Sequence, residues 1–204
     1  MKKDISDRAQ IERLSAFSDN IIAFALTLLA LDLMPKKSGV SSLLTFTDLT
    51  TLFHPLAAFI LSFIVVGTLW SIYHELFDFI IKVDSRITLA NLVLLFFIVT
   101  VPFSAALVSS YFGQTVSTFV YSLNALMLAL CLDYMVVYIE RHPLYLHEDI
   151  DKGKMRTFRI SCNVGIINGV VAVAVSFFLP LLSFIILLVR PLTNYFVKIF
   201  YKLR

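Results

Sequence analysis

The sequence predicts an all-α integral membrane protein with six membrane-spanning helices in each subunit. Hydrophobic residues occupy 59% of the 204 positions and charged residues only 15%, which is too apolar for a soluble globular domain. A bilayer core of about 30 Å requires about 20 apolar residues per helix. Residues 1–204 are therefore expected to form one six-helix transmembrane domain, with little length left for a soluble one.

The apolar runs place the helices in order along the chain. The first run begins after the polar segment that contains Arg13 and an Asp-containing turn, and it ends at Pro35. The second is expected to continue beyond the membrane over residues 74–81. Pro102 lies inside the third, and Pro180 separates the last two. The expected spans are about 17–34, 55–73, 87–108, 115–138, 158–179 and 181–197.

The basic residues predict the topology. If the spans alternate in direction, Lys36 and Lys37 lie on one side of the membrane and most other basic residues lie on the opposite side. By the positive-inside rule, the richer side is cytoplasmic and both termini lie there. The residues on that side are Lys2, Lys3, Arg8, Arg13, Lys82, Arg86, Arg141, Lys152, Lys154, Arg156, Arg159, Lys198, Lys202 and Arg204. No cleavable signal peptide is expected, because no small-residue cleavage site follows the first apolar run.

Arg190, beside Pro191, fits neither side of this topology. It marks either the cytoplasmic end of a shorter sixth helix or a buried functional charge. The first interpretation is favoured, because an arginine at the centre of a membrane is costly.

The first span carries polar residues among apolar ones. With 100° per residue, one stripe of this helix contains Phe17, Asn20, Phe24, Thr27, Leu28 and Leu31, and Asp19 points roughly away from Phe24. Polar groups in hydrocarbon are costly without partners, so they usually mark a bundle interior or a pathway. Taken alone, the apolar part of the stripe is more often packed in a core or against lipid.

A second set of polar residues is expected at one depth, near the cytoplasmic boundary. Since Trp70 and His74 share a helix face, one hydrogen-bond network can join the first three spans. The favoured interpretation is architectural, and the alternative is gating or proton transfer by His74. The set consists of Arg13, Ser18, Asp19, Trp70, His74 and Asn91.

Other residues give weaker signals. Cys131 and Cys162 lie in apolar runs, so no disulfide is expected. Asp133, near the inner end of the fourth span, is expected either to pair with a basic group or to line a vestibule. The loop with His142, His147, Glu148, Asp149 and Asp151 is interpreted as solvated rather than metal-binding, because it lacks a ligand spacing.

Several motifs are missing from the sequence. It contains no TVGYG filter loop, no regularly spaced arginines, and no Walker or Rossmann motif. These absences disfavour the usual potassium-channel filter, a voltage sensor and a nucleotide-driven pump. A six-helix unit without internal repeats needs several copies to enclose a pore, which favours a symmetric homo-oligomer.

The motifs resemble those of a known family. The pattern RxxxFSD opens the first span and is followed by a TLLxLD-like run at residues 27–32. Further similar residues occur in the same order in the next two spans. Together they resemble the bacterial members of the transmembrane protein 175 family, the endosomal and lysosomal potassium channels. The residues that carry the resemblance are Arg13, Phe17, Ser18, Asp19, Trp70, His74, Phe77, Asp84, Leu89, Asn91 and Pro102.

The resemblance implies a homotetramer in a bacterial inner membrane, with the first helix of each subunit lining a central pore. Phe24 falls at the constriction, where other members carry isoleucine or leucine. Leu28 and Leu31 would form further rings, and Thr27 matches a threonine implicated in potassium preference. The polar set named above corresponds to the family's structural network.

The function implied is passive conduction of potassium and other monovalent cations, with weak to moderate selectivity for potassium over sodium. Apart from the permeating ion, no cofactor or metal is expected, and no nucleic-acid partner. A proton or cation transporter with Asp19, His74 and Asp133 as relay groups is the alternative. A membrane-embedded enzyme has little support, because the sequence shows no nucleophile constellation.

Overall fold

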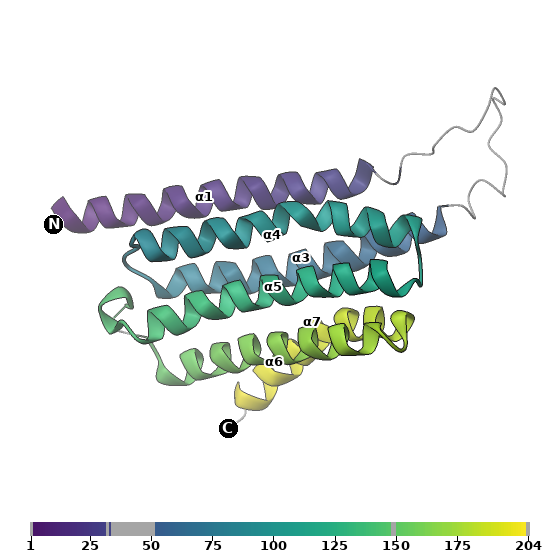
Figure 1. The fold of residues 1–204 in the computed structure, drawn as a ribbon. Coiled ribbons are helices and arrows are strands. Elements are labelled where there is room, and N and C mark those ends of the chain that lie inside the picture. The colour runs from purple at the N-terminus through teal and green to yellow at the C-terminus, as the bar shows by residue number, and fades with distance from the viewer. Residues whose placement is uncertain (1, 32, 34–51, 148–149, 203–204) are drawn as a thin grey trace.

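The chain folds into a bundle of long helices (Figure 1). The computed structural model describes residues 2–31, 33, 52–147 and 150–202. Within these ranges the α-helices are α1 (Lys2–Leu31), α3 (Phe53–Phe79), α4 (Ser85–Ser110), α5 (Thr115–Glu140), α6 (Lys152–Ser176) and α7 (Pro180–Lys202), with a short 3-10 helix η1 (Pro143–Tyr145) between α5 and α6. The predicted all-α class is confirmed.

Local chemistry explains where several helices begin. The Asp84 carboxylate accepts a hydrogen bond from the backbone N–H of Ile87 at 2.9 Å, which caps α4. The Asp151 carboxylate caps α6 through Gly153 in the same way. Such caps satisfy backbone donors that the first helical turn leaves without a partner. Pro180 opens α7, a position where proline needs no amide hydrogen.

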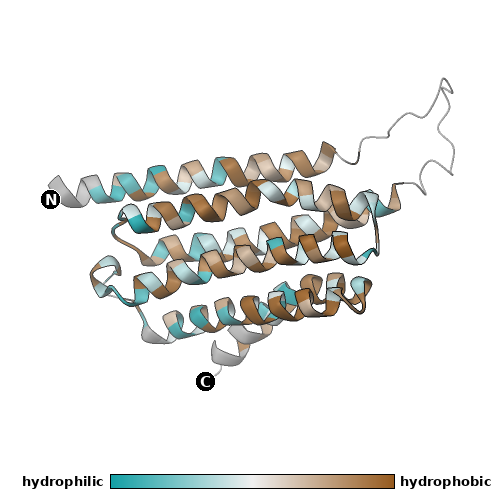
Figure 2. Cartoon of the chain, viewed as in Figure 1, coloured by the Kyte–Doolittle hydropathy of each residue, from teal (hydrophilic) through white to brown (hydrophobic). Residues whose placement is uncertain are grey.

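Successive helices run in opposite directions along the bundle. Figure 1 shows the α3–α4 turn and the α5–α6 connection near the end of the molecule where the N-terminus lies, and the α4–α5 and α6–α7 links at the other end. In Figure 2 hydrophilic residues gather toward that first end, whereas apolar residues predominate along the bodies of the helices. The alternation of direction expected from the sequence is therefore present.

Five helices are long and apolar enough to cross a membrane, namely 7–31, 53–79, 85–110, 115–140 and 153–176. In the described part of the chain, α7 contributes a shorter apolar segment, Pro180–Phe196. The fold is thus that of a multi-pass membrane protein. The expected continuation of the second helix through residues 74–81 is largely confirmed, since α3 runs to Phe79.

Two expectations are corrected by the helix boundaries. α1 is continuous from Lys2 to Leu31, so the Asp-containing turn expected at the start of the first span is absent and the polar segment before Phe17 is itself helical. α7 continues through Arg190 and Pro191 to Lys202, so Arg190 does not end a shorter helix. The expected end of the first span at 34, Pro35, Lys36, Lys37, Glu148, Asp149 and Arg204 lie outside the described residues.

Candidate pore-lining face and its polar network

Helix α1 has one buried face and one exposed face in the single chain. The buried face packs against α3 and α4 and consists of Ser18, Ile22, Ala25 and Leu29, spaced three or four residues apart. On the opposite side, Phe24 is 61% exposed and Leu31 is 54% exposed. The exposed face, defined by Phe17, Asn20, Phe24, Thr27 and Leu31, has a half-buried Leu28 at its edge.

Polar side chains on this exposed face have few partners. The Thr27 hydroxyl donates to the backbone carbonyl of Phe24 at 2.7 Å, within its own helix. Within the described part of the chain, the Asn20 amide makes no hydrogen bond. An unpaired amide in hydrocarbon costs several kcal/mol, so this face is suited to water or to another protein surface rather than to lipid tails.

Behind the exposed face, a buried hydrogen-bond cluster ties α1 to α3 and α4. The Ser18 and Asn91 side chains are fully buried, and Asn91 Nδ2 donates to Ser18 Oγ at 2.9 Å. The Tyr73 hydroxyl lies 2.7 Å from Ser18 Oγ and 2.8 Å from Asn91 Oδ1. Ser18 also donates to the Leu14 carbonyl at 2.8 Å. The cluster fixes the rotation of α1 about its axis and hence the direction of its exposed face.

A second contact holds the same side of α1 nearer to the surface. Trp70 Nε1 donates to Asp19 Oδ1 at 2.9 Å. The rings of Trp70 and His74 are stacked, with their centroids 5.5 Å apart. The hydrogen-bond partner of Asp19 is thus Trp70 on the neighbouring helix α3, and the His74 ring packs against the Trp70 ring.

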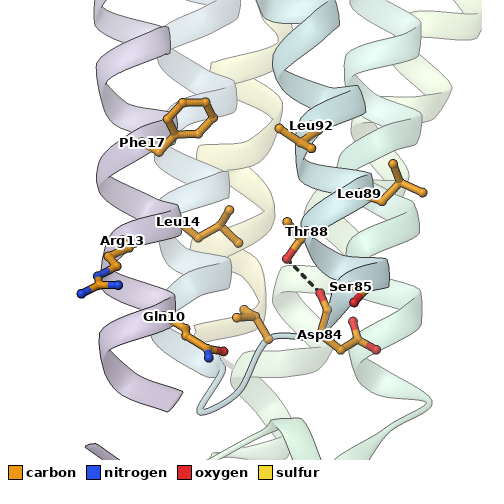
Figure 3. Close-up of a pocket in the computed structure, with 10 residues that line it drawn as sticks. Gln10, Arg13, Leu14, Phe17, Asp84, Ser85, Thr88, Leu89 and Leu92 are labelled. Atoms are coloured by element: carbon orange, nitrogen blue, oxygen red, sulfur yellow. Dashed lines mark hydrogen bonds between the residues drawn. The ribbon is translucent and has the colours of Figure 1, made fainter. Parts of the chain in front are cut away.

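Arg13 is the one member of the expected polar set that stands apart. Its side chain is exposed and points away from α4 (Figure 3), and it makes no hydrogen bond or ion pair with the network among the described residues. It borders a groove of about 810 Å³ between the first half of α1 and the start of α4. Phe17 and Leu92 face each other across this groove (Figure 3).

Tyr73 is the residue that the sequence analysis missed. It lies between the two flagged aromatic residues Trp70 and His74, but in an apolar run a tyrosine resembles core packing. Its hydroxyl is at the centre of the cluster. The signal available in the sequence was that a buried tyrosine hydroxyl usually finds a partner.

The residues that gave weaker signals in the sequence, Asp133 and His142 among them, lie elsewhere in the bundle. Asp133 pairs with a basic group, since its Oδ1 lies 3.9 Å from Nη1 of Arg159. His142 Nδ1 lies 2.7 Å from the Tyr138 carbonyl oxygen in the α5–α6 connection. In the part of the chain that the structure describes, no three His, Cys, Asp or Glu side chains are grouped as a metal site would require.

The fold and the two-faced α1 define a multi-pass α-helical membrane protein whose first helix is anchored on one side and open on the other. Residues 13–102 match the family model of the endosomal/lysosomal potassium channel TMEM175. A potassium channel of Chryseobacterium sp. is 32% identical over 84% of this chain and 85% of that one. A potassium channel of Streptomyces collinus is 29% identical over 81% of this chain and 82% of that one.

The fold agrees with a solved relative. The crystal structure of a homologue, from Chamaesiphon minutus, of the lysosomal potassium-selective channel TMEM175 superposes with a TM-score of 0.78 at 24% identity, and the match covers 95% of this chain and 98% of that one. The chain belongs to the TMEM175 family. This is a family of ion channels rather than of enzymes.

Proposed function

We propose that this protein is a passive potassium-permeable cation channel of a bacterial inner membrane. Four copies surround a central axis, both termini of each copy face the cytoplasm, and the exposed face of α1 lines the pore. Family membership supports the channel assignment, and the relatives from Chryseobacterium sp. and Streptomyces collinus both carry the name potassium channel. The basic residues of the α3–α4 and α5–α6 connections support the orientation.

The observation that carries the proposal is the composition of the exposed face of α1. Asn20 and Thr27 lie on the same exposed side as Phe24 and Leu31. Since the Asn20 amide has no partner among the described residues, a lipid-facing position would leave it unpaired at substantial cost. A water-containing pore on the symmetry axis hydrates the amide and also accommodates the large apolar side chains.

In this arrangement Phe24 forms the main constriction, and Leu28 and Leu31 form further rings. A narrow ring of apolar side chains excludes water and blocks ions, and a widened ring admits a partly hydrated ion. Potassium loses its hydration water more readily than sodium, so even an apolar constriction favours potassium modestly. Thr27 adds polar oxygen atoms near the ring, because its hydroxyl oxygen retains lone pairs after donating to Phe24.

The polar network has a structural role in this proposal. Ser18, Tyr73 and Asn91 hold α1 from behind, and Asp19 is held by Trp70. The alternative of a transporter relay through Asp19, His74 and Asp133 finds no continuous path in the described contacts. Asp19 is bonded to α3, whereas Asp133 lies on α5 beside Arg159 of α6.

The test is ionic current across planar bilayers that contain the purified protein, under potassium and sodium gradients. Phe24→Ala is expected to increase single-channel conductance and to weaken closure, because it widens the narrowest ring. The matched control is Phe178→Ala, which truncates an exposed phenylalanine at the α6–α7 turn. Unchanged currents with Phe24→Ala would remove this residue from the constriction, and saturable flux without unitary current steps would favour a transporter.

A further inference from the structure

Helix α7 carries a polar stripe that faces the interior of the bundle. Ser183, Arg190 and Asn194 are buried, and seven or four residues separate them along the helix. The apolar residues Ile185 and Leu192 are exposed instead. The Ser183 hydroxyl is satisfied by Ser122 Oγ and by the Ala172 carbonyl, both at 2.9 Å. Arg190 and Asn194, deeper along the stripe, are not satisfied in this way.

Buried polar atoms without a hydrogen bond are concentrated in this part of the protein. Among the described residues, each such side-chain atom belongs to α5, α6 or α7. They are Asp133 Oδ1, Asn168 Oδ1, Arg190 Nε, Asn194 Nδ2 and Asn194 Oδ1. Buried polar groups are nearly always hydrogen-bonded in folded proteins, so such a cluster indicates that a further component occupies the site.

Arg190 is the most demanding member of the cluster. It is 3% exposed, and its guanidinium makes no hydrogen bond or ion pair within the described residues. The neighbouring carboxylates of Asp133 and Glu140 lie 3.9 Å and 3.1 Å from Arg159.

The site is shaped around this guanidinium. A Cβ atom at Gly165 of α6 would lie 2.6 Å from Nη2 of Arg190. Arg190 therefore occupies the space that any other residue at position 165 would fill. On the next turn of α7, Asn194 offers an amide whose nitrogen and oxygen both lack a partner.

The chemistry of these groups favours an anion. A guanidinium stays protonated in proteins and carries five N–H donors, and an isolated charge in a low-dielectric interior is very costly. Among the described residues, Arg190 Nε and Asn194 Nδ2 are the two donor atoms of the cluster that lack a hydrogen bond, and they lie one turn apart on α7, whereas the oxygens of Asp133 and Asn168 belong to α5 and α6. We propose that Arg190 and Asn194, between α6 and α7, bind a small monovalent anion such as chloride. This site is separate from the pore and does not depend on the proposed conduction.

The burial of Arg190 between helices favours a small anion. Arg190 is buried between helices, so a phospholipid headgroup in the surrounding bilayer does not reach it. A halide needs only N–H donors and little space. Chloride binding would stabilise the α6–α7 pair by supplying the missing counter-charge.

The experiment compares thermal unfolding of the full-length protein in potassium chloride and in potassium gluconate at equal ionic strength. The wild-type melting temperature is expected to rise saturably with chloride, by about 5 °C or more when chloride exceeds its dissociation constant a hundredfold. Crystals grown with bromide are expected to show an anomalous peak beside Arg190.

Asn194→Asp is the decisive variant, because it places a fixed carboxylate one turn from Arg190. It is expected to melt higher than the wild type in gluconate and to lose the response to chloride. Asn124→Asp is the matched control, since Asn124 is also buried but bonds to Thr100 and Ser104 rather than lying beside an arginine. This control is expected to be destabilised in both salts.

Three outcomes would overturn the proposal. If the wild type melts at the same temperature in chloride and gluconate, the cluster holds only water. If Asn194→Asp responds to chloride as the wild type does, the anion acts elsewhere. If Asn124→Asp stabilises the protein in gluconate as Asn194→Asp does, the added carboxylate has no specific relation to Arg190.

Discussion

Replacing Tyr73 with phenylalanine removes one hydroxyl from the cluster that holds α1, and the consequence can be worked out bond by bond. The wild-type hydroxyl lies 2.8 Å from Asn91 Oδ1 and 2.7 Å from Ser18 Oγ. Ser18 retains its donation to the Leu14 carbonyl and its bond from Asn91 Nδ2 when Tyr73 is changed. Asn91 Oδ1, in a fully buried side chain, loses its donor.

The expected loss of stability follows from that one orphaned oxygen. A buried acceptor left without a donor costs about 1–3 kcal/mol. Interhelical hydrogen bonds in membranes average about 0.6 kcal/mol with a maximum near 1.7. We therefore expect Tyr73→Phe to cost about 1–2 kcal/mol, or about 2–8 °C in melting temperature for a chain of this length.

The same reasoning predicts that a second change reduces the damage. Asn91→Leu removes the orphaned oxygen, so Tyr73→Phe combined with Asn91→Leu is expected to be less destabilising than the sum of the two single changes. Thermal unfolding of the purified protein measures all three variants. Tyr134→Phe is the control, since Tyr134 is 53% exposed and its hydroxyl serves no buried acceptor among the described residues. Strictly additive losses, or an equal loss in the control, would refute the argument from the orphaned oxygen.

Two further predictions concern the bundle as a whole. Gly165→Ala is expected to leave the protein less stable than Gly67→Ala does in thermal unfolding, because its Cβ would lie 2.6 Å from Arg190 Nη2 and the guanidinium must shift. Gly67→Ala is the control, since a Cβ there meets nothing within 4 Å and alanine favours the helix. Burial works to raise the pKa of Asp84, but hydrogen bonds from Tyr138 and from the Ile87 amide outweigh it and hold that pKa below its usual value. The stability that Asp84 contributes is thus present above the unfolded pKa of about 3.9 and is lost as pH falls through the lower folded pKa. Tyr138→Phe should reduce this loss in acid unfolding titrations.

The fold followed from features that a sequence carries locally. Apolar runs predicted each α-helix of the described bundle, five of them of membrane length and that of α7 shorter, and prolines and capping aspartates lie at several of their ends. The error in α1 has a local cause as well. The sequence was expected to form an Asp-containing turn before the helix, yet the segment before Phe17 contains lysine, arginine, glutamine and alanine, which favour helix in water.

The polar network was predictable in part, because depth along a span can be read from sequence. Ser18 and Asn91 meet as that argument suggested. The participation of Tyr73 depended on its direction toward α1, and helix packing fixes that direction. Arg13 was included for its depth, although its side chain points away from α4.

For Arg190, the prediction from the average energetic cost of an arginine in a membrane was wrong. A central arginine is expensive in a membrane, so a position at the helix end was favoured. The residue that makes the burial feasible is Gly165, which lies 25 positions earlier in the chain on the neighbouring helix. Only the antiparallel pairing of α6 with α7 brings the two together.

The two faces of α1 connect these structural details to the proposed channel. A pore-lining helix must present the same residues to the axis in every subunit, so its rotation has to be fixed by contacts that are not themselves in the pore. The bonds from Tyr73 and Asn91 to Ser18 meet that requirement, because they lie on the buried face. Phe24 and Thr27 on the other face are then free to vary in size and polarity without loosening the helix. Changes on the buried face should therefore affect stability first, and changes on the exposed face should affect conduction first.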